Sequence, residues 1–210
     1  MHKNVLKFAY NVFNNMGNEI EYQDVASYLL KGTQLFGRNK KELMTLSNSA
    51  KALEYITEEA FNGREVTKEL VLDIHRVLMD GISSTCGVYR KHNVKQYACG
   101  VHNYKDIDRS LDQFIDFYNK IKICNSASYL AAFAHAEIIR IHPFNDGNGR
   151  VALLLTNFIL IKHNLPIISI EAADRELYYY FTDLYTKRHV IQPMVDLIEM
   201  YTRGGGNRVC

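Results

Sequence analysis

The feature that most constrains this chain is the stretch of residues 142–150 together with the apolar run directly after it. The stretch reads His-Pro-Phe-Asn-Asp-Gly-Asn-Gly-Arg, and the run covers residues 151–161. The run is too short to cross a bilayer and predicts a buried helix. Glycines at such a junction let the backbone approach a ligand closely, and the first helical turn offers unpaired N–H groups at the positive end of its dipole. We therefore expect this junction to hold an anion such as a phosphate.

The side chains around this junction indicate chemistry on that phosphate. His142 ends the preceding helical segment, where the turn would bring its imidazole over the same spot, and a neutral imidazole suits a general base. Asp146 is able to hold a hard cation, although capping of the next helix is the alternative. Arg150 carries a planar guanidinium that matches phosphate oxygens. These residues predict phosphoryl or nucleotidyl transfer.

Composition sets limits on the other classes of protein. With 210 residues, 47% of them hydrophobic, we expect a single domain over residues 1–203, with an N-terminal helical region at about 1–60 and a core at about 61–203, and then a flexible tail at 204–210. A net charge of +2 gives no reason to expect a nucleic-acid partner, and no segment suggests a membrane span. The four cysteines form no C-x-x-C pair and no secretory signal precedes them, so reduced thiols in a cytoplasmic protein are expected.

Apolar residues recur at helical spacing along most of the chain, which predicts an all-α bundle. The helical stretches are residues 4–31 (interrupted at Gly17), 43–56, 66–78, 107–118, 128–141, 149–163, 171–187 and 193–201. The spacing is lost between residues 83 and 104. Here residues 88–99, bounded by glycines, predict a small β-hairpin.

Residues 142–150 closely resemble the signature of the Fic family, His-Pro-Phe-x-Asp/Glu-Gly-Asn-Gly-Arg-x-x-Arg. The resemblance implies a Fic-fold helical bundle in which His142 deprotonates a hydroxyl of a target protein, and that oxygen attacks the α-phosphate of a nucleotide. It implies ATP or another nucleoside triphosphate as donor, pyrophosphate release, and Mg²⁺ bound at Asp146. It also implies phosphate contacts from Gly147, Asn148, Gly149 and Arg150, with Phe144 as a buried anchor of the loop.

Two further features resemble the same family. Gly87, Tyr89 and Arg90, followed by Val94, are similar to the family's flap, which would align an extended segment of the target protein. Asn157 matches an Asn often found in the helix after the signature; it meets the nucleoside or makes an interhelical hydrogen bond. We interpret Tyr178, Tyr179 and Tyr180 as packing residues, and His135 and Glu137 as structural.

The chain departs from the signature at its last position, where Leu153 replaces the second Arg. Many relatives pair that Arg with an inhibitory Glu, and the corresponding N-terminal segment here has Val12 and Met16 in place of Ser/Thr and Glu. Because exchanging a whole buried ion pair for apolar residues costs little, we expect Met16 and Leu153 to pack together. Glu-type autoinhibition would then be absent, and ATP binding would lose a charged contact.

Both glycines, Gly147 and Gly149, favour transfer of AMP or another nucleoside monophosphate among the family's reactions. Two alternatives remain open: transfer of a different phosphate-linked group, and a catalytically weak module that acts by binding nucleotide or protein. The sequence also leaves open a homo-oligomer and delivery as a secreted effector.

Overall fold

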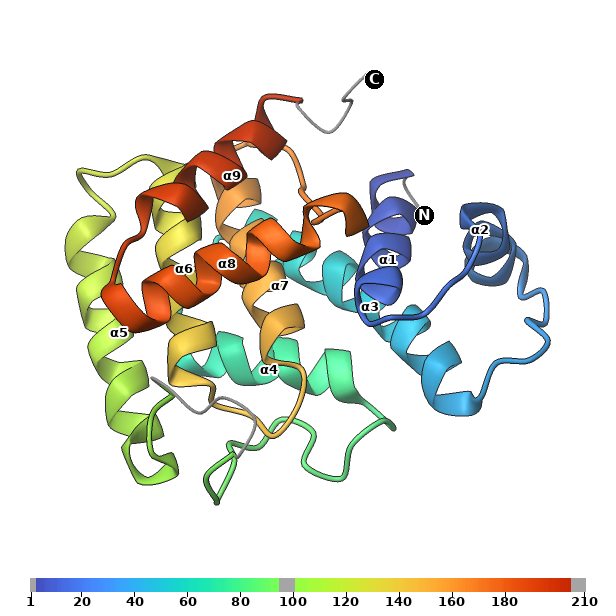
Figure 1. Cartoon of the computed structure of the whole chain (residues 1–210), viewed down its shortest axis with the longest axis horizontal. Helices are drawn as coiled ribbons and strands as arrows, with labels where there is room; N and C mark the ends of the chain where they lie inside the picture. Colours follow the sequence, from blue (N-terminus) through green and yellow to red (C-terminus); the bar gives the residue numbers. More distant parts are fainter. Residues whose placement is uncertain (1–2, 95–100, 205–210) are drawn as a thin grey trace.

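A computed structural model describes residues 3–94 and 101–204, and within these ranges the regular elements are all helices, with no strand (Figure 1). The helices are α1 (Lys3–Asn15), α2 (Tyr22–Lys31), α3 (Lys40–Phe61), α4 (Lys68–Met79), α5 (Ile107–Ile121), α6 (Ala127–Ile141), α7 (Asn148–Lys162), α8 (Arg175–Arg188) and α9 (Gln192–Thr202). Single 3₁₀ turns, η1 (Tyr104–Asp106) and η2 (Ala172–Asp174), precede α5 and α8. The predicted all-α class is confirmed.

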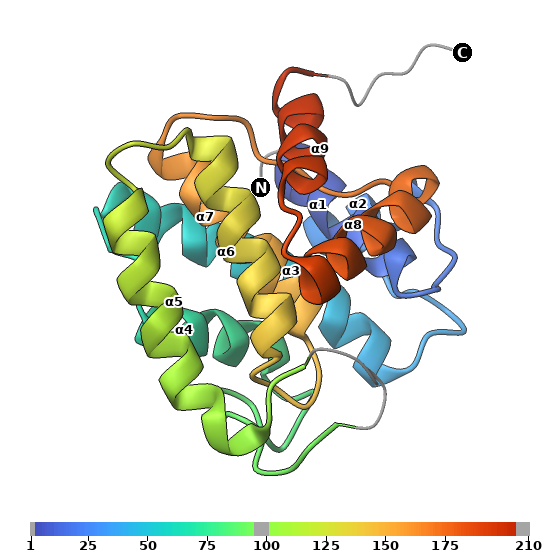
Figure 2. The same cartoon turned by 60° about the vertical axis from the view of Figure 1, so that its left-hand side comes forward.

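Helices α6 and α7 form the centre of the bundle and pack against each other (Figures 1 and 2). Every residue of the apolar run 151–161 in α7 is buried, as expected from its sequence. A helix that is apolar on all sides is stable only when other elements surround it. Within the described ranges no helix is long and apolar enough to traverse a lipid bilayer.

Helices α3, α4, α5, α8 and α9 pack around this pair, and α1 and α2 lie outside α3. Helix α3 packs against α1, α4 and α7, while α5, α8 and α9 pack against α6. Local sequence fixes where several of them begin. Asn39 and Glu42 form a capping box at the start of α3, and the hydroxyl oxygens of Thr67 and Ser126 accept N–H groups from the first turns of α4 and α6. This arrangement places the loop of residues 142–147 at one end of the central pair.

The predicted β-hairpin is wrong for the part of it that the structure describes. Residues 88–94 contain no strand, and 95–99 lie outside the described residues, as does 205–210 of the predicted tail. The physical reason lies in Arg90. Its main-chain N–H, which a hairpin would have paired with the opposite strand, donates to the carbonyl of Pro143 at 2.9 Å. Its guanidinium donates to the carbonyls of His92 (3.0 Å) and His102 (2.6 Å). A contact with the distant loop after α6 therefore takes a backbone donor that strand pairing would have used.

Asn157 of α7 bonds to its own helix and to the connector that follows it, not to a second helix. A contact with the nucleoside stays a prediction. Asn157 is fully buried, and its Nδ2 donates to the carbonyls of Leu153 (3.0 Å) and Ile168 (2.9 Å). Its Oδ1 accepts the N–H of Ile168 at 2.7 Å. The amide thus satisfies both backbone groups of one residue in the connector after α7 and holds that connector to the central helix.

Replacement of Asn157 by Ala is expected to lower the free energy of unfolding by about 2–4 kcal/mol, because the buried N–H and C=O of Ile168 lose their partner. Urea denaturation of both proteins measures this difference. Asn119→Ala is the matched control, since Asn119 is exposed on α5. Equal losses of stability in the two variants would contradict this role of Asn157.

Candidate functional site

The loop between α6 and α7 opens on a cavity of about 460 Å³. Its walls come from the end of α1, from α6, from the start of α7 and from α8. The lining residues are Val12, Asn15, Met16, His135, Ile139, His142, Asn145, Asp146, Gly147, Asn148, Gly149, Arg150, Leu153, Ile170, Arg175, Tyr178, Tyr179 and Thr182. The structure therefore brings His142 together with residues 146–150 in a space of the size that small ligands occupy.

His142 caps the C-terminus of α6 in a left-handed conformation, with φ of 52°. Its N–H donates to the carbonyl of Ile138 at 2.9 Å, and its own carbonyl accepts from Nε of Arg90 at 2.7 Å. The backbone on both sides of the imidazole is therefore fixed. Burial lowers the pKa of His142 to about 4, so the ring is neutral at physiological pH.

The loop after His142 is closed by the side chain of Asn148. Its Oδ1 accepts the N–H of Phe144 and its Nδ2 donates to the carbonyl of the same residue, each at 2.9 Å. The Phe144 ring is completely buried and stacks on the imidazole of His75, with 3.7 Å between ring centroids. The predicted anchor role of Phe144 fits this position. Asn148 supports the loop with its side chain, which leaves its main chain as the group able to meet a phosphate.

The backbone conformation at position 147 requires a glycine. Its φ is +84°, and a Cβ there would lie 3.1 Å from Sδ of Met79. Gly149 is different: its φ is ordinary for a helix, and a Cβ at this position would have the Tyr178 hydroxyl as its nearest atom, at 4.0 Å. Gly149 thus leaves its amide open to the cavity, in the first turn of α7, where N–H groups have no partner within the helix.

Arg150 is the buried cation of the site. Its side chain is only 10% exposed, and Nη2 lies 3.3 Å from Oδ2 of Asp146. Its other terminal nitrogen, Nη1, is buried and has no hydrogen-bond partner among the described residues. A buried guanidinium nitrogen without an acceptor is costly, and an anion in the cavity would supply that acceptor.

Asp146 is the residue best suited to a hard cation. Its side chain is 59% exposed, and Oδ1 accepts the N–H of Gly147 at 2.6 Å. Within residues 3–94 and 101–204, no group of three His, Cys, Asp or Glu side chains is placed to hold a metal ion. A single carboxylate beside a phosphate site fits Mg²⁺, which commonly takes one or two carboxylates together with substrate phosphates and water.

The segment predicted as a flap is fastened to this loop. Arg90 is only 3% exposed and makes two hydrogen bonds to the loop. Its main-chain N–H donates to the carbonyl of Pro143 at 2.9 Å, and its side-chain Nε donates to the carbonyl of His142. Tyr89 packs near Phe144, with 5.6 Å between ring centroids, and Gly87 has a φ of +66°. Val94 lies half-buried at the end of the described part. A role for these residues in docking a target stays a prediction.

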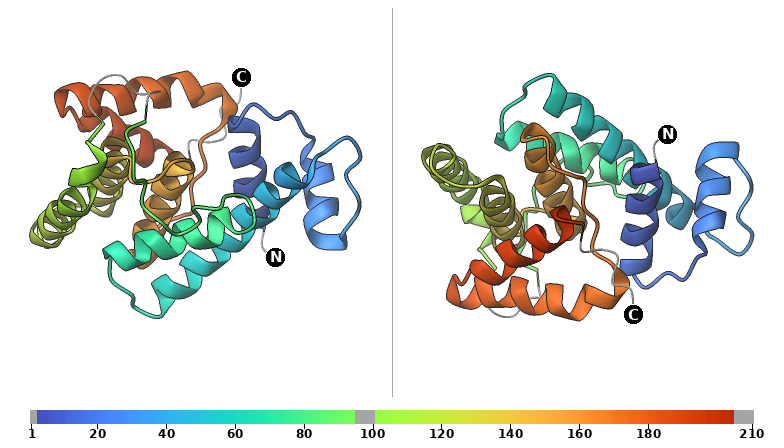
Figure 3. Two further views of the ribbon diagram at one scale, coloured as in Figure 1. Left: turned by 90° about the horizontal axis from the view of Figure 1, so that it is seen from below. Right: turned by 90° about the horizontal axis from the view of Figure 1, so that it is seen from above.

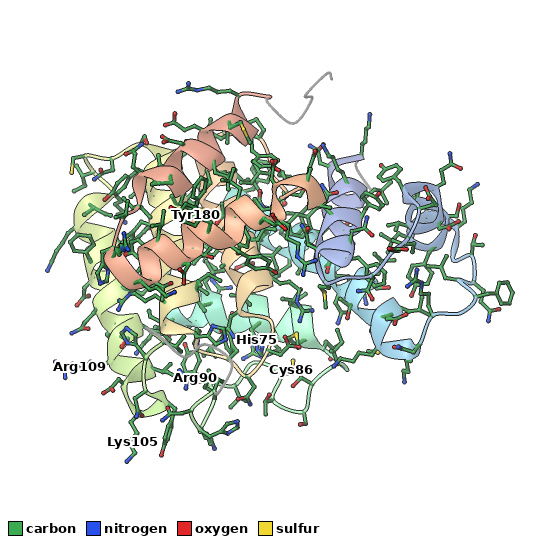
Figure 4. The ribbon with its side chains drawn as sticks, in the orientation of Figure 1. His75, Cys86, Arg90, Lys105, Arg109 and Tyr180 are labelled. Atoms are coloured by element: carbon green, nitrogen blue, oxygen red, sulfur yellow. The ribbon has the colours of Figure 1, made fainter. Side chains whose placement is uncertain are left out.

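His75 of α4 is a site residue that sequence reasoning missed (Figure 4). Its Nδ1 accepts the N–H of Gly87 at 2.9 Å, so Nε2 carries the proton and donates to the carbonyl of Asp146 at 3.2 Å. Burial lowers its pKa to about 4. The ring therefore bridges the segment that begins at Gly87 and the loop between α6 and α7. The sequence did hold a signal for this role. His75 follows Ile74 in the helix predicted over residues 66–78, and a histidine on the apolar side of such a helix indicates a buried ring.

His135 and Tyr178 also belong to the cavity wall, in addition to the structural and packing roles that the sequence predicts for them. The Thr156 hydroxyl donates to the carbonyl of Ala152, so Nδ1 of His135 donates to that hydroxyl at 3.0 Å. Nε2 then accepts from the Tyr178 hydroxyl at 2.9 Å. This contact fixes the tyrosine hydroxyl over Gly149, and burial lowers the pKa of His135 to about 4.

The residues that depart from the signature line the same cavity. Leu153 lies one turn into α7, and Val12 and Met16 come from the end of α1. Leu153 is 8% exposed and Met16 is 45% exposed. Direct contact between the two side chains stays a prediction. This part of the wall is apolar, where the signature would place a second arginine.

Replacement of His75 by Phe is expected to keep the stacked ring and remove both hydrogen bonds. The N–H of Gly87 and the C=O of Asp146, which are only partly buried, then lose their partner, which lowers the free energy of unfolding by about 1–2 kcal/mol. Amide hydrogen exchange at Gly87 should become at least about tenfold faster. His163→Phe, at an exposed histidine, is the control. Unchanged exchange at Gly87 would show that the bridge is unimportant.

The three buried histidines predict a loss of stability on acidification. Their pKa is about 4 in the folded protein, against about 6.5 in the unfolded chain, so the unfolded state binds more protons below pH 6.5. Stability therefore falls as the pH drops from 6.5 towards 4, by about 2 kcal/mol per histidine at pH 5.

Urea denaturation at pH 7 and pH 5 measures this effect. His135→Gln should reduce the difference between the two pH values by about one third, because one of three contributing groups is removed. His163→Gln replaces an exposed histidine and is the control. A difference that His135→Gln leaves unchanged would argue against buried histidines as the cause.

Comparison with known proteins gives a consistent picture. Residues 65–160 match the Fic/DOC family. The protein adenylyltransferase Fic of Drosophila erecta is 28% identical over 187 residues, which are 87% of this chain and 37% of that protein. The chain thus spans well under half the length of this curated relative.

Solved structures share the arrangement of helices. A Fic domain containing signaling protein from Bacteroides thetaiotaomicron superposes with a TM-score of 0.84 at 25% identity, over 96% of this chain and 84% of that one. Fic-1 from C. elegans gives a TM-score of 0.88 at 21% identity, over 98% of this chain and 62% of that one. With its signature loop, its cavity and these similarities, the chain resembles the Fic/DOC family, whose match covers residues 65–160.

Proposed function

We propose that this chain is a protein adenylyltransferase-type enzyme, which transfers AMP from ATP to a hydroxyl side chain of a target protein. One observation carries the proposal: His142 and the 147–150 turn line a single cavity, in which Nη1 of the buried Arg150 has no partner among the described residues. The names of the relatives support adenylyl as the transferred group. Other nucleoside triphosphates are alternative donors.

His142 acts as the general base. Its neutral imidazole takes the proton of the target hydroxyl while the oxygen forms a bond to the α-phosphorus. The bond from that phosphorus to the bridging oxygen breaks, and pyrophosphate leaves with the electron pair. The product is a phosphodiester between AMP and the target, and the proton on His142 passes to solvent.

The low pKa of His142 refers to the cavity without a nucleotide. Burial is the main cause of the low value, and the cation of Arg90 adds to it. Phosphate charges beside the ring favour the imidazolium form and raise the pKa towards a range suited to proton transfer. The donor therefore increases the basicity of the group that activates the acceptor.

The phosphates are held from the start of α7. The Gly149 amide and the Arg150 guanidinium supply donors, and the helix dipole adds positive potential. Asp146, together with phosphate oxygens and water, would hold Mg²⁺, which neutralises charge that develops on the phosphates.

The target protein is proposed to dock along residues 87–94. This segment is tied to the loop through Arg90 and His75, so a chain lying on it is fixed relative to His142. Val88 is 44% exposed there and offers an apolar contact. An extended segment of the target would place its hydroxyl at the mouth of the cavity.

The test is transfer of label to protein from ATP, GTP, UTP and CTP labelled at the α-phosphate, with Mg²⁺ and a cell extract as the source of targets. We expect label from one preferred nucleotide, equal amounts of pyrophosphate released, and no transfer with EDTA present. His142→Ala should reduce transfer by about 10²–10⁴-fold or more. His163→Ala is the control for loss of an exposed histidine.

The other outcomes identify the alternatives. Nucleotide binding without any transfer would indicate a binding module. A parallel reaction with γ-labelled ATP covers the other case: label from the γ-phosphate and none from the α-phosphate would indicate a kinase-type reaction. Transfer that persists in folded His142→Ala protein would remove His142 from the mechanism.

A further inference from the structure

The cavity has two cationic arginines in its wall, and only one of them belongs to the signature. Among the described residues that line it, Arg150 and Arg175 are the arginine or lysine side chains. Arg150 lies in the first turn of α7 and is paired with Asp146. Arg175 is the first residue of α8 and comes from a different wall.

Arg175 is held without a countercharge. No carboxylate of the described residues forms an ion pair with it, and its guanidinium lies over the Tyr179 ring, 5.6 Å from the centroid. The N-terminus is the positive end of the helix dipole, so a cation there is electrostatically unfavourable. A half-buried cation at this position, facing a cavity, has its charge balanced when an anion enters.

The start of α8 lies beside α1, as Figures 1 and 3 show. Nδ2 of Asn15, near the end of α1, donates to the carbonyl of Ile170 at 2.6 Å. The Tyr201 hydroxyl accepts the N–H of Glu171 at 2.9 Å and donates to Oδ2 of Asp174 at 2.7 Å. These contacts fix the connector that leads directly into Arg175.

The wall on this side of the cavity is otherwise apolar. Val12 and Met16 of α1, Leu153 of α7 and Ile170 of the connector line it. A nucleoside triphosphate held at the start of α7 by its α-phosphate must place its terminal phosphates somewhere in this space. Apolar side chains cannot balance their charge, so the free cation of Arg175 is the group suited to do so.

We propose that Arg175 is a phosphate-binding residue that contacts the terminal phosphates of the donor, in place of the cation that Leu153 does not provide. This inference rests on the proposed function, because it assumes a nucleotide with its α-phosphate at residues 147–150. It makes donor binding depend on two walls, α7 and α8. It also predicts preference for a triphosphate over a monophosphate.

Binding measurements test this directly. Isothermal titration calorimetry with Mg²⁺ compares AMP and a non-hydrolysable ATP analogue on the full chain and on Arg175→Gln. Loss of a charge-assisted contact should weaken binding of the analogue by about 10- to 100-fold and change AMP binding by less than about twofold. Arg188→Gln, an exposed arginine at the other end of α8, is the matched control and should leave both affinities unchanged.

Two further variants strengthen the test. Arg175→Lys keeps the charge and should retain part of the preference for the triphosphate. Arg175→Gln combined with Leu153→Arg should regain affinity for the analogue, because a cation returns to the same part of the cavity. Circular dichroism and thermal unfolding establish that each variant is folded.

Equal weakening of AMP and analogue binding, or no weakening of either, would overturn the inference. So would a wild-type protein that binds the two nucleotides equally well. His142-dependent transfer with an unchanged KM for ATP in Arg175→Gln would reject the role of Arg175 and leave the proposed function intact. If binding of the analogue depends on Arg175 but the wild-type protein transfers nothing, the role of Arg175 is supported and the proposed function is rejected.

Discussion

The packing of α6 against α7 is the constraint on which the rest of the structure depends. Both helices are buried along most of their length, so the loop that joins them, residues 142–147, must reverse the chain at a largely buried position. Buried backbone groups need partners. Arg90, Asn148 and His75 supply them from three different elements. The same contacts that satisfy these buried groups therefore also fix the loop that begins at His142, the proposed general base.

The same burial shapes the electrostatics of the cavity. Withdrawal from water keeps His142 neutral and lowers the pKa of Arg150, which nevertheless remains charged near neutral pH. In a site of low effective dielectric, each charge acts over a longer range than in water. A polyphosphate entering such a site interacts strongly with Arg150 and with the start of α7, and it meets few competing water molecules. The cavity is therefore suited to anions before any catalytic step is considered.

Most of this fold could be predicted from the sequence, for local reasons. The helical spacing, the run at 151–161 and the signature loop each depend on residues that are near in sequence. The sequence also placed His142 beside residues 147–150, and one cavity holds them, while their chemical roles stay predictions. The failures arise from contacts between distant residues. The β-hairpin was wrong because the main-chain N–H of Arg90 is bound to the carbonyl of Pro143, and the bridge through His75 joins Gly87 to Asp146. The position of Tyr178 over Gly149 likewise depends on a hydrogen bond to His135, more than forty residues away in sequence.

Helix α8 is the wall that is least secured by apolar packing. Thr182 and Tyr185 are its buried residues, whereas α7 is buried along its whole apolar run. Tyrosine hydroxyls attach α8 to α6: Tyr178 to His135, and Tyr185 to Oε1 of Glu137 at 2.5 Å. Such hydrogen bonds each contribute only about 1 kcal/mol net, while burial of a large apolar side chain contributes about 1.5–3 kcal/mol. A ligand that binds both α7 and Arg175 therefore adds a comparable contribution to holding α8 in place. Binding of the proposed donor would therefore stabilise α8 against local unfolding.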